Sequence, residues 1–595
     1  MRTAAAQFDD IPGQLPEAKV PEDADYASIG QATIEKLNNL QDHDLAPFAI
    51  WRDLLSLTDT FRTFQSAETV FKNFTHLRAE KHCSDFRLHN ESEPRRTDAP
   101  DPPTSWLNYD VSFTVNNGGL IGVCAGTVSV MLTSSGDWKI WMLCTWLENY
   151  ENHGHPDQTD AKSDSEISKS DDTQVYEAAI IGGGQGGLGV AGRLNALGVR
   201  NIMFDERPSI GDSWADRYDS LHWHTIKEYG NLPLGRTFDK DDPDLLPRER
   251  IASAYKNWSK KHMLNVREHT QIVGAKWDES NRIWSVEGKT PSGTQVWKAK
   301  NLVLTIGPGH KTPVSPDWAT PEKIKSSGFK GTITHSVHYH NTDGFAGKRG
   351  IVVGTANTAH DVAEDMANAK MDVTIVQRNP TFIFPGEWLV QTEAKSYHRD
   401  KPTELSDRQD ITRPNKIQRE LANRNVHHLI KQNPELFDGL EQAGFKVHRY
   451  GDLFTHLYVR FGGHYINTGG SNRIINGEIK VQTAAVKGLT PEGLLFEDGT
   501  TVSADLIVLA TGYNHDFRDD ASQILGTHVT DQMDDYWSPD AEGELRGYAR
   551  FAGHPSLYYG GGECRSARFF SRFIALQIQK ESLGYPLQPY LEGRK

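Results

Sequence analysis

The residues best suited to chemistry lie in two glycine-rich turns about 170 residues apart. The first turn spans residues 182–187, follows an apolar stretch at 176–181 and precedes a helical pattern at 188–197. Its spacing is G-x-G-x-x-G, in which the first glycine makes the tight turn, the second admits a pyrophosphate and the third lets helix and strand pack closely. Free N–H groups at the positive end of the helix dipole then bind the phosphates. The sequence therefore predicts a dinucleotide site made by Gly182, Gly184, Gln185, Gly186 and Gly187.

An acidic residue follows at the position that such a site requires. The next apolar stretch, 201–204, leads into Asp205, about 20 residues after the turn. A carboxylate there accepts hydrogen bonds from ribose hydroxyls and suits an unphosphorylated ribose, such as the one in FAD. We predict that Asp205 fills this role, with Glu206 as the alternative.

The second turn, 354–359, follows a strand-like stretch at 350–353 but matches the pattern less well. Ala356 and Ala359 stand where the second and third glycines are expected, and a methyl group there crowds the phosphate. The next strand-like stretch, 373–376, leads to Gln377 and Arg378. An arginine offers a fork of charged donors for a 2′-phosphate and favours NADPH over NADH, although an ordinary surface arginine is the alternative. The predicted NADPH-binding residues are Gly354, Thr355, Asn357, Thr358 and Arg378.

Composition limits the class of protein. A chain of 595 residues is too long for one hydrophobic core, so several domains are expected. The formal charge of −15 argues against nucleic acid or an anionic membrane as the main partner. We find no apolar run long enough to span a membrane and no signal-peptide pattern, so a cytoplasmic location is the default. The four cysteines are isolated, so no CxxC pair or metal site is expected and electrons must pass through a bound cofactor.

The chain divides into segments that differ in composition and in hydrophobic pattern. Helical patterning around 48–74 is followed by three alternating stretches near 109–115, 128–132 and 138–146, which predict an α+β unit with an antiparallel sheet. This unit resembles the NTF2-like cone fold, and it could bind a ligand or serve for dimerisation. Beyond a polar linker, alternating patterns predict an α/β fold with two Rossmann-type domains. The expected boundaries are an NTF2-like domain with a disordered N-terminal tail at 1–150, a linker at 151–174, the first part of an FAD domain at 175–345, an NADPH domain with a helical insertion at 346–499, and the second part of the FAD domain at 500–595.

A longer motif carries a family resemblance. Residues Phe329-x-Gly331-x-x-x-His335-Ser336-x-x-Tyr339 resemble the fingerprint F-x-G-x-x-x-H-S-x-x-[YF] of the class B flavoprotein monooxygenases, in particular their flavin-containing monooxygenase branch. Baeyer–Villiger monooxygenases usually have tryptophan where Tyr339 stands. The resemblance extends over roughly residues 175–585. It implies that this stretch connects the FAD and NADPH domains rather than transferring protons.

Shorter segments agree with the resemblance. Residues 210–214 resemble a G-x-x-W segment beside the flavin, which implies that Ser213 and Trp214 contact the cofactor, and 509–513 resemble an A-T-G-Y strand end with Thr511 and Gly512. Residues 218–227 are similar to the L-H-x-x-K pattern of YUCCA-like enzymes, which adds Thr225 to the cofactor contacts. His224 is the residue expected to face the flavin as a hydrogen-bond donor or proton-tuning group, and a structural histidine beside Trp223 is the alternative. Animal-type relatives carry asparagine at this position.

The resemblance implies an enzyme that uses NADPH to reduce FAD, forms a C4a-hydroperoxyflavin with O₂ and transfers one oxygen atom to a small organic substrate. N- or S-oxygenation or hydroxylation is the first expectation. Oxidative decarboxylation of a 2-oxo acid of the indole-3-pyruvate type, or Baeyer–Villiger oxidation, is the alternative. A non-catalytic flavin-binding module is a third possibility because of Ala356 and Ala359. A homodimer through the N-terminal domain is also expected.

Overall fold

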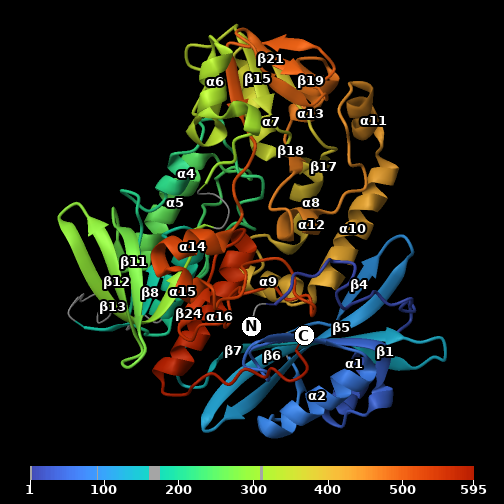
Figure 1. Cartoon of the computed structure of the whole chain (residues 1–595). Coiled ribbons are helices and arrows are strands. Elements are labelled where there is room, and N and C mark those ends of the chain that lie inside the picture. The colour runs from blue at the N-terminus through green and yellow to red at the C-terminus, as the bar shows by residue number, and fades with distance from the viewer. Residues whose placement is uncertain (1–2, 90–91, 160–173, 308–311, 595) are drawn as a thin grey trace.

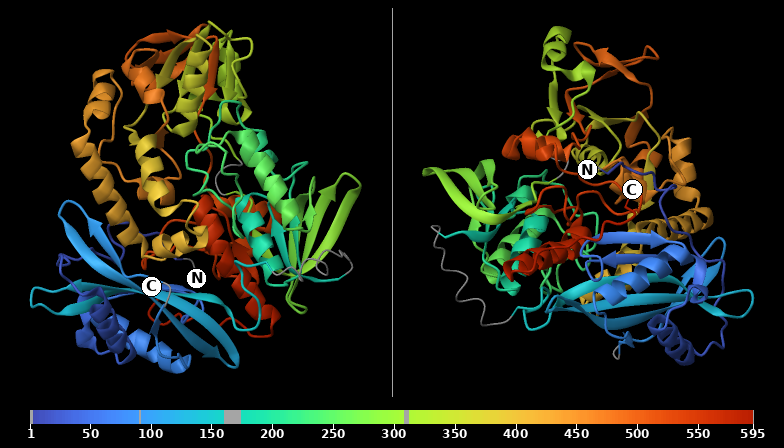
Figure 2. Two further views of the ribbon diagram at one scale, coloured as in Figure 1. Left: turned by 180° about the vertical axis from the view of Figure 1, so that it is seen from behind. Right: turned by 60° about the horizontal axis from the view of Figure 1, so that its bottom comes forward.

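The computed structural model describes residues 3–89, 92–159, 174–307 and 312–594. It contains three larger sheets, each with helices packed against it (Figure 1). In Figure 1 the N-terminal unit lies at the bottom, the first α/β unit at the left and the second α/β unit at the top, and the two chain ends lie near each other. Figure 2 shows the same arrangement from behind and from below.

The N-terminal unit is a seven-stranded sheet in the order β2-β1-β7-β6-β5-β3, with β4 paired to β5. Its elements are α1 (Tyr26–Asn38), η1 (Asp42–Asp44), β1 (Leu45–Leu54), β2 (Phe61–Gln65), α2 (Ala67–Glu80), β3 (Arg87–Leu88), β4 (Arg95–Ala99), β5 (Thr104–Asn117), β6 (Leu120–Leu132) and β7 (Trp138–Tyr150). The predicted antiparallel strands are present as β5, β6 and β7. The α+β expectation is therefore confirmed, whereas the NTF2-like identity stays a prediction.

Two expectations for this region need correction. Helical patterning was expected over 48–74, but only the last part of that range is helical, in α2. The earlier part contains β1 and β2, in which nearly every residue is buried, so the alternation that marks a strand is lost. The N-terminal tail is packed rather than disordered: the Ala6 amide donates to the Pro539 carbonyl at 2.8 Å, and the Lys416 ammonium donates to the Phe8 carbonyl at 2.7 Å. Its scattered apolar residues are buried, namely Phe8, Ile11, Leu15, Ala18 and Val20.

The first α/β unit is a seven-stranded sheet in the order β10-β9-β8-β13-β12-β11, with β24 paired to β13. Its elements are β8 (Tyr176–Ile181), α3 (Gln185–Ala196), β9 (Asn201–Phe204), α4 (Asp212–Ala215), α5 (Arg248–Lys261), β10 (Val266–Arg267), β11 (Gln271–Asp278), β12 (Ile283–Thr290), β13 (Gly293–Leu304), α14 (Phe517–Leu525), α15 (Thr527–Thr530), β24 (Leu557–Tyr559) and α16 (Cys564–Ser582). Strands β8, β9, β10, β13 and β24 pair in parallel, so their carboxyl ends share one edge. The buried helices α3 and α16 contact each other.

The second α/β unit has a five-stranded, fully parallel sheet in the order β14-β23-β15-β16-β19. Its elements are η2 (Asp317–Ala319), α6 (Pro321–Ser327), β14 (Thr332–His335), η3 (Ser336–His338), β15 (Arg349–Val353), α7 (Asn357–Asn368), β16 (Asp372–Val376), β19 (Ile479–Gln482), β20 (Val486–Leu489), β21 (Gly493–Phe496), β22 (Thr501–Ser503) and β23 (Leu506–Leu509). The expectation of two Rossmann-type units is confirmed. The boundaries at 345/346 and 499/500 need correction, because β14 and β23 both pair within this sheet.

A helical insertion lies between β16 and β19. It contains β17 (Phe382–Pro385), α8 (Gly386–Ser396), α9 (Thr403–Ile411), α10 (Asn415–Gln432), α11 (Glu435–Gln442), α12 (Leu453–Tyr458), β18 (His464–Asn467) and α13 (Gly470–Ile475). Helix α10 extends toward the N-terminal unit (Figure 1), where His428 lies 3.0 Å from Asp101. Helix α9 contacts α16 of the first α/β unit and β18 contacts α7 of the second, so the insertion contacts all three units.

A buried ion cluster joins the N-terminal unit to the rest of the chain. Asp157, just after β7, lies 2.7 Å from Arg193 of α3, 2.8 Å from Arg408 of α9 and 3.1 Å from Arg572 of α16. Glu148 of β7 shares Arg408 and Arg572. Burial raises the pKa of both carboxyls, but the guanidinium groups outweigh it and hold each pKa well below its usual range.

The predicted linker is therefore anchored at its start, while its remainder, 160–173, lies outside the described residues. Glu148, His155 and Asp157 have the spacing of a metal site, but guanidinium groups hold the two carboxylates. The cluster is thus an ion-pair arrangement that fixes the N-terminal unit on α3 and α16. Within the described part of the chain, no helix has the length and apolarity needed to span a membrane.

Candidate cofactor sites and the junction between them

The first glycine turn has the geometry that its spacing predicts. Gly182 has φ 108°, and a Cβ there would lie 2.4 Å from the Thr305 carbonyl oxygen. A Cβ at Gly187 would lie 1.9 Å from the Gly182 carbonyl, so only glycine lets α3 approach β8 this closely. A Cβ at Gly184 would meet no described atom within 4 Å. The turn is therefore closed on its protein side and open at the position where a pyrophosphate would approach.

Gln185 and Gly186 face the C-terminal segment. The Gln185 amide donates to the Gly562 carbonyl at 2.8 Å, and a Cβ at Gly186 would lie 2.7 Å from Gly561 Cα. The loop 560–562 lies just before α16. Gly184 is the N-cap of α3 and has no side chain that could cap the helix. The amides of the first turn of α3 are therefore available to phosphate oxygens.

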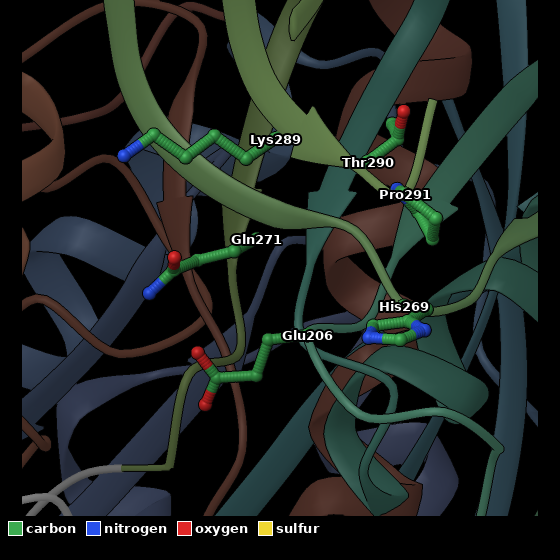
Figure 3. Close-up of a pocket in the computed structure, with 6 residues that line it drawn as sticks. All are labelled: Glu206, His269, Gln271, Lys289, Thr290 and Pro291. Carbon is green, nitrogen blue, oxygen red and sulfur yellow. The ribbon is translucent and has the colours of Figure 1, made fainter. Parts of the chain in front are cut away.

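The two candidate ribose-binding acids differ in position. Asp205 accepts hydrogen bonds from the Gly183 and Arg207 amides, both at 2.8 Å, and thus holds the turn together. Burial raises its pKa, and these two amides only partly offset the effect. Glu206 instead lines an open pocket of about 470 Å³ together with His269, Gln271, Lys289, Thr290 and Pro291 (Figure 3). The geometry therefore favours Glu206 over Asp205 as the residue that would meet a ribose.

The second turn keeps only part of this geometry. Gly354 has φ 127°, and a Cβ there would lie 2.3 Å from the Ala510 carbonyl oxygen, as at Gly182. Ala356 is the N-cap of α7, again without a side-chain capping bond among the described residues. The Asn357 side chain accepts the Ile466 amide at 2.8 Å, which ties the start of α7 to the helical insertion.

The remaining predicted residues of this turn have distinct roles. The Thr355 hydroxyl pairs with the Thr381 hydroxyl at 2.6 Å, and Thr358 hydrogen-bonds the phenol of Tyr218. Gln377 is buried and donates to the Lys446 carbonyl at 2.8 Å, whereas Arg378 is exposed at the end of β16. Arg378 is therefore accessible to a 2′-phosphate beside the turn.

His224 lies where the two α/β units meet. Its Nε2 is 3.3 Å from an Asp361 carboxylate oxygen on α7, and the Tyr218 hydroxyl donates to the other oxygen at 2.6 Å. Trp214 packs edge-on against Trp223 at 5.7 Å, which places the G-x-x-W segment beside the same loop. Ser213 is exposed at the surface of α4. The loop that contains His224 is thus joined to the helix of the second turn through one buried carboxylate.

Neighbouring residues of this loop have structural partners. The Thr225 hydroxyl donates to both carboxylate oxygens of Glu393, at 2.7 and 2.8 Å. The Lys227 ammonium is buried and donates to the carbonyls of Lys240 and Asp242, so it closes a loop and is not offered to a substrate. Sequence reasoning missed Asp361 and Glu393. The position of Asp361 on the helix after the second turn was the only available signal, and Glu393 had none.

The fingerprint segment packs within the second α/β unit, and His340, just beyond it, accepts a hydrogen bond from the Asp219 amide at 2.8 Å, so its role in connecting the units stays a prediction. His335 ends β14, and its ring accepts the Val337 amide at 3.2 Å, while the Tyr339 hydroxyl donates to Asp365 of α7 at 2.5 Å. Burial lowers the pKa of His335. Thr511 donates to the Val314 carbonyl, and the Gly512 carbonyl accepts the Val314 amide at 3.0 Å.

Thr511 and Gly512 were expected in the second part of the FAD domain. They follow β23, which belongs to the second sheet, so this expectation needs correction. The matching strand end in the first sheet is β13, which leads into Thr305 and Gly307. Thr511 and Gly512 therefore lie on the connection between the units.

Comparison with known proteins identifies the class. A sequence model described as flavin-binding monooxygenase-like matches residues 209–525, which include the G-x-x-W segment, the fingerprint and the second turn. The chain belongs to this family, and the expectation of a flavin-binding monooxygenase, and hence of an enzyme, is confirmed.

Individual proteins are also similar. The indole-3-pyruvate monooxygenase YUCCA1 of Oryza sativa subsp. japonica is 28% identical over 346 residues, which are 58% of this chain and 78% of that protein. YUCCA6 of Arabidopsis thaliana is 25% identical over 343 residues, 57% of this chain and 76% of that protein. A solved structure of cyclohexanone monooxygenase from Rhodococcus sp. Phi1 bound to NADP⁺ covers 69% of this chain and 84% of its own, at 16% identity and a TM-score of 0.47.

Proposed function

We propose that the chain is an FAD- and NADPH-dependent monooxygenase that holds FAD on the first turn and NADPH on the second. The observation that carries this proposal is the contact of His224 with Asp361. It joins the loop after the first turn to the helix after the second turn, so two dinucleotides bound at the two turns would extend toward the same junction.

The residues of the first turn fit FAD. Gly184 leaves space for the pyrophosphate, and the amides at the start of α3 supply donors at the positive end of the helix dipole. Glu206 has an open carboxylate on the side of the pocket where Gln271 and Lys289 also extend (Figure 3). That carboxylate would accept hydrogen bonds from ribose hydroxyls. Asp205 would act indirectly, by holding Gly183 in place.

The residues of the second turn fit NADPH less completely. The amides at the start of α7 would bind the pyrophosphate, and Arg378 would pair with the 2′-phosphate. Ala356 narrows the approach relative to glycine, so we expect weaker binding here than at the first turn. Weak, exchangeable binding is suitable for a coenzyme that must leave after each turnover.

FAD and NADPH, when bound, supply hydride transfer and the activation of dioxygen. The residues of the chain bind, orient and shield. Asp361 accepts from His224 Nε2 and so favours the tautomer with its proton there, which leaves Nδ1 as the acceptor. In the doubly protonated ring, Nδ1 becomes a donor. His224 is therefore the residue proposed to hold or donate a proton at the junction.

The substrate is proposed to be a small organic molecule that accepts one oxygen atom, with N- or S-oxygenation or hydroxylation as the first class. The named relatives favour a second candidate, oxidative decarboxylation of a 2-oxo acid, since both are indole-3-pyruvate monooxygenases. Lys227 is the lysine of the L-H-x-x-K pattern, and its ammonium group donates to the backbone carbonyls of Lys240 and Asp242. A substrate carboxylate would therefore need another partner.

The domain assignment is proposed with corrected limits. The FAD domain combines the sheet residues 176–304 with 557–559, and the NADPH domain runs from 332 to 509. The cytoplasmic location, the NTF2-like identity and the homodimer through the N-terminal unit remain proposals. Cell fractionation tests the first, and sedimentation of the purified protein tests the dimer.

The central experiment combines three readouts on the purified protein. It should copurify with FAD, oxidise NADPH under air, and convert members of a panel of amines, sulfides, ketones and 2-oxo acids to products that contain one atom from ¹⁸O₂. Retention of FAD without any bleaching by NADPH under anaerobic conditions would instead support a non-catalytic flavin-binding module.

A further inference from the structure

The carboxylate of Glu393 accepts hydrogen bonds from the two residues that follow His224. Thr225 donates its hydroxyl to both oxygens, and the Ile226 amide donates to one of them at 3.0 Å. Glu393 lies on α8 of the helical insertion, whereas Thr225 belongs to the first α/β unit. A single side chain therefore connects the insertion to the His224 loop.

The surroundings of this carboxylate are unusual for a buried acid. Among the described residues, no lysine, arginine or histidine nitrogen lies within 4.0 Å of its oxygens. Its hydrogen-bond donors are neutral, namely a hydroxyl and an amide. Burial raises the pKa of Glu393 to about 7, and the Ile226 and Thr225 hydrogen bonds only partly oppose this effect.

The charged and titratable groups around Glu393 come from three directions. Helix α16 contributes Glu563, which raises the pKa of Glu393, and Arg565, which lowers it. The His224 loop contributes Tyr229, whose hydroxyl donates to Glu563 at 3.2 Å, and the end of α8 leads to Tyr397, which packs against Tyr229 at 4.9 Å. Burial raises the pKa of both phenols far above neutrality. Neither phenol is therefore a source of negative charge beside Glu393 at neutral pH.

We propose that Glu393 is a positioning residue, which holds Thr225 and Ile226 and thereby fixes His224 against Asp361. This inference rests on the proposed function, because His224 matters to the reaction only if the cofactors meet at the junction. Ionised Glu393 accepts hydrogen bonds from two donors of the loop, the Thr225 hydroxyl, which is shared between both carboxylate oxygens, and the Ile226 amide. Protonated Glu393 has a hydroxyl of its own and one fewer strong acceptor, so it holds the loop less firmly.

A matched set of variants tests the proposal. Glu393→Gln keeps the shape of the side chain and one acceptor oxygen but removes the charge. Glu393→Ala removes the hydrogen bonds to Thr225 and Ile226 altogether. Glu387→Gln is the control, because Glu387 is exposed in the first turn of the same helix. Each holoenzyme is assayed from pH 6 to pH 9 for kcat, KM for NADPH and hydrogen peroxide released per NADPH consumed.

In the wild type, kcat and coupling should rise through pH 7. Glu393→Gln should lose that rise, with kcat about 10-fold lower at pH 8 and more peroxide released, while KM for NADPH and the FAD content stay unchanged. Glu393→Ala should be at least as impaired, and Thr225→Val combined with Glu393→Gln should be no worse than the poorer single variant. Glu387→Gln should behave as wild type. A wild-type pH profile in Glu393→Gln, or additive losses in the double variant, would overturn the proposal.

A second measurement separates this inference from the proposed function. Thermal unfolding of wild type and Glu393→Gln is compared between pH 5 and pH 8, with no substrate or NADPH. The carboxyl has a higher pKa folded than unfolded, so wild type should lose stability relative to Glu393→Gln as pH rises through that range. A shift in stability without oxygenation of any substrate would sink the proposed function alone. Equal pH dependence in both proteins would sink the assignment of Glu393.

Discussion

In each of the two glycine turns a helix packs closely against the preceding strand, but the closest contact lies at a different place in each. In the first, α3 approaches β8 most closely at its amino end, where Gly187 lies over Gly182. In the second, Ala359 occupies the corresponding position, and close contact occurs instead at the far end of the helix, where a Cβ at Gly350 would lie 2.6 Å from Met366 Sδ. The first turn thus keeps its tightest fit beside the phosphate site, and the second does not. The difference teaches that a turn can keep its strand-to-helix chain path while relaxing the fit around its ligand.

The largest test of this difference is Gly184→Val. The new side chain enters space that is empty of described protein atoms, so the fold should persist while the pyrophosphate is blocked. We expect colourless protein with a melting temperature close to that of wild-type protein stripped of FAD, as measured by absorbance and calorimetry. Gly187→Ala is the contrasting variant, because its methyl group would collide with the Gly182 carbonyl and destabilise the fold itself. Stoichiometric FAD in Gly184→Val would break the assignment of the first turn.

The next effect concerns Arg378. Loss of a charge-assisted hydrogen bond costs about 1.5–3 kcal/mol, so Arg378→Ala should raise KM for NADPH by roughly 10- to 100-fold and KM for NADH far less. Steady-state kinetics with both coenzymes measure the ratio. Arg349→Ala is a suitable control, since Arg349 is a surface arginine of the same sheet that pairs with Asp505 at 2.8 Å. Equal changes for NADPH and NADH would remove Arg378 from the phosphate site.

Glu206 and Asp205 provide a smaller, paired test. Glu206→Gln should weaken FAD retention by about 10-fold through the lost ribose hydrogen bonds, with unchanged thermal stability of the FAD-free protein. Asp205→Asn should instead lower that stability. Asp205 accepts hydrogen bonds from two backbone amides, and the side-chain NH₂ group of asparagine would leave one of them without an acceptor. Equilibrium dialysis and thermal unfolding measure the two quantities. If Asp205→Asn weakened FAD retention and Glu206→Gln did not, Asp205 would be the residue that binds the ribose.

The smallest effect is expected from Ala356→Gly. Removing the methyl group widens the approach to the second turn, and glycine is a better N-cap than alanine by a few tenths of a kcal/mol or more. We expect KM for NADPH to fall by about two- to threefold, with a slight gain in stability. A rise in KM would mean that the alanine contributes to binding and that the second turn is not a weakened copy of the first.

Local patterns in the sequence were enough to predict the turns, because a strand, a glycine turn and a helix occupy one short stretch. Contacts between distant segments were not predicted. His224 and Asp361 are 137 positions apart, and Thr225 and Glu393 are more than 160 apart, so neither pairing leaves a periodic signal. The sheet of β23 was misassigned for the same reason, since Thr511 and Gly512 carry the same local motif in either unit. The packed tail was missed because its apolar residues are spaced irregularly.

The ion cluster at Asp157 has a consequence for any shortened form of the enzyme. A chain that begins near residue 174 would contain both turns and the fingerprint, yet Arg193 and Arg572 would lose the carboxylates that neutralise them. Leaving one member of a buried pair alone costs about 3–5 kcal/mol, a large fraction of the stability of an ordinary domain. Those arginines lie on α3 and α16, the helices beside the first turn. Glu148 and Asp157 therefore supply the negative charges that neutralise these buried arginines, and we expect the smallest active enzyme to include the N-terminal unit.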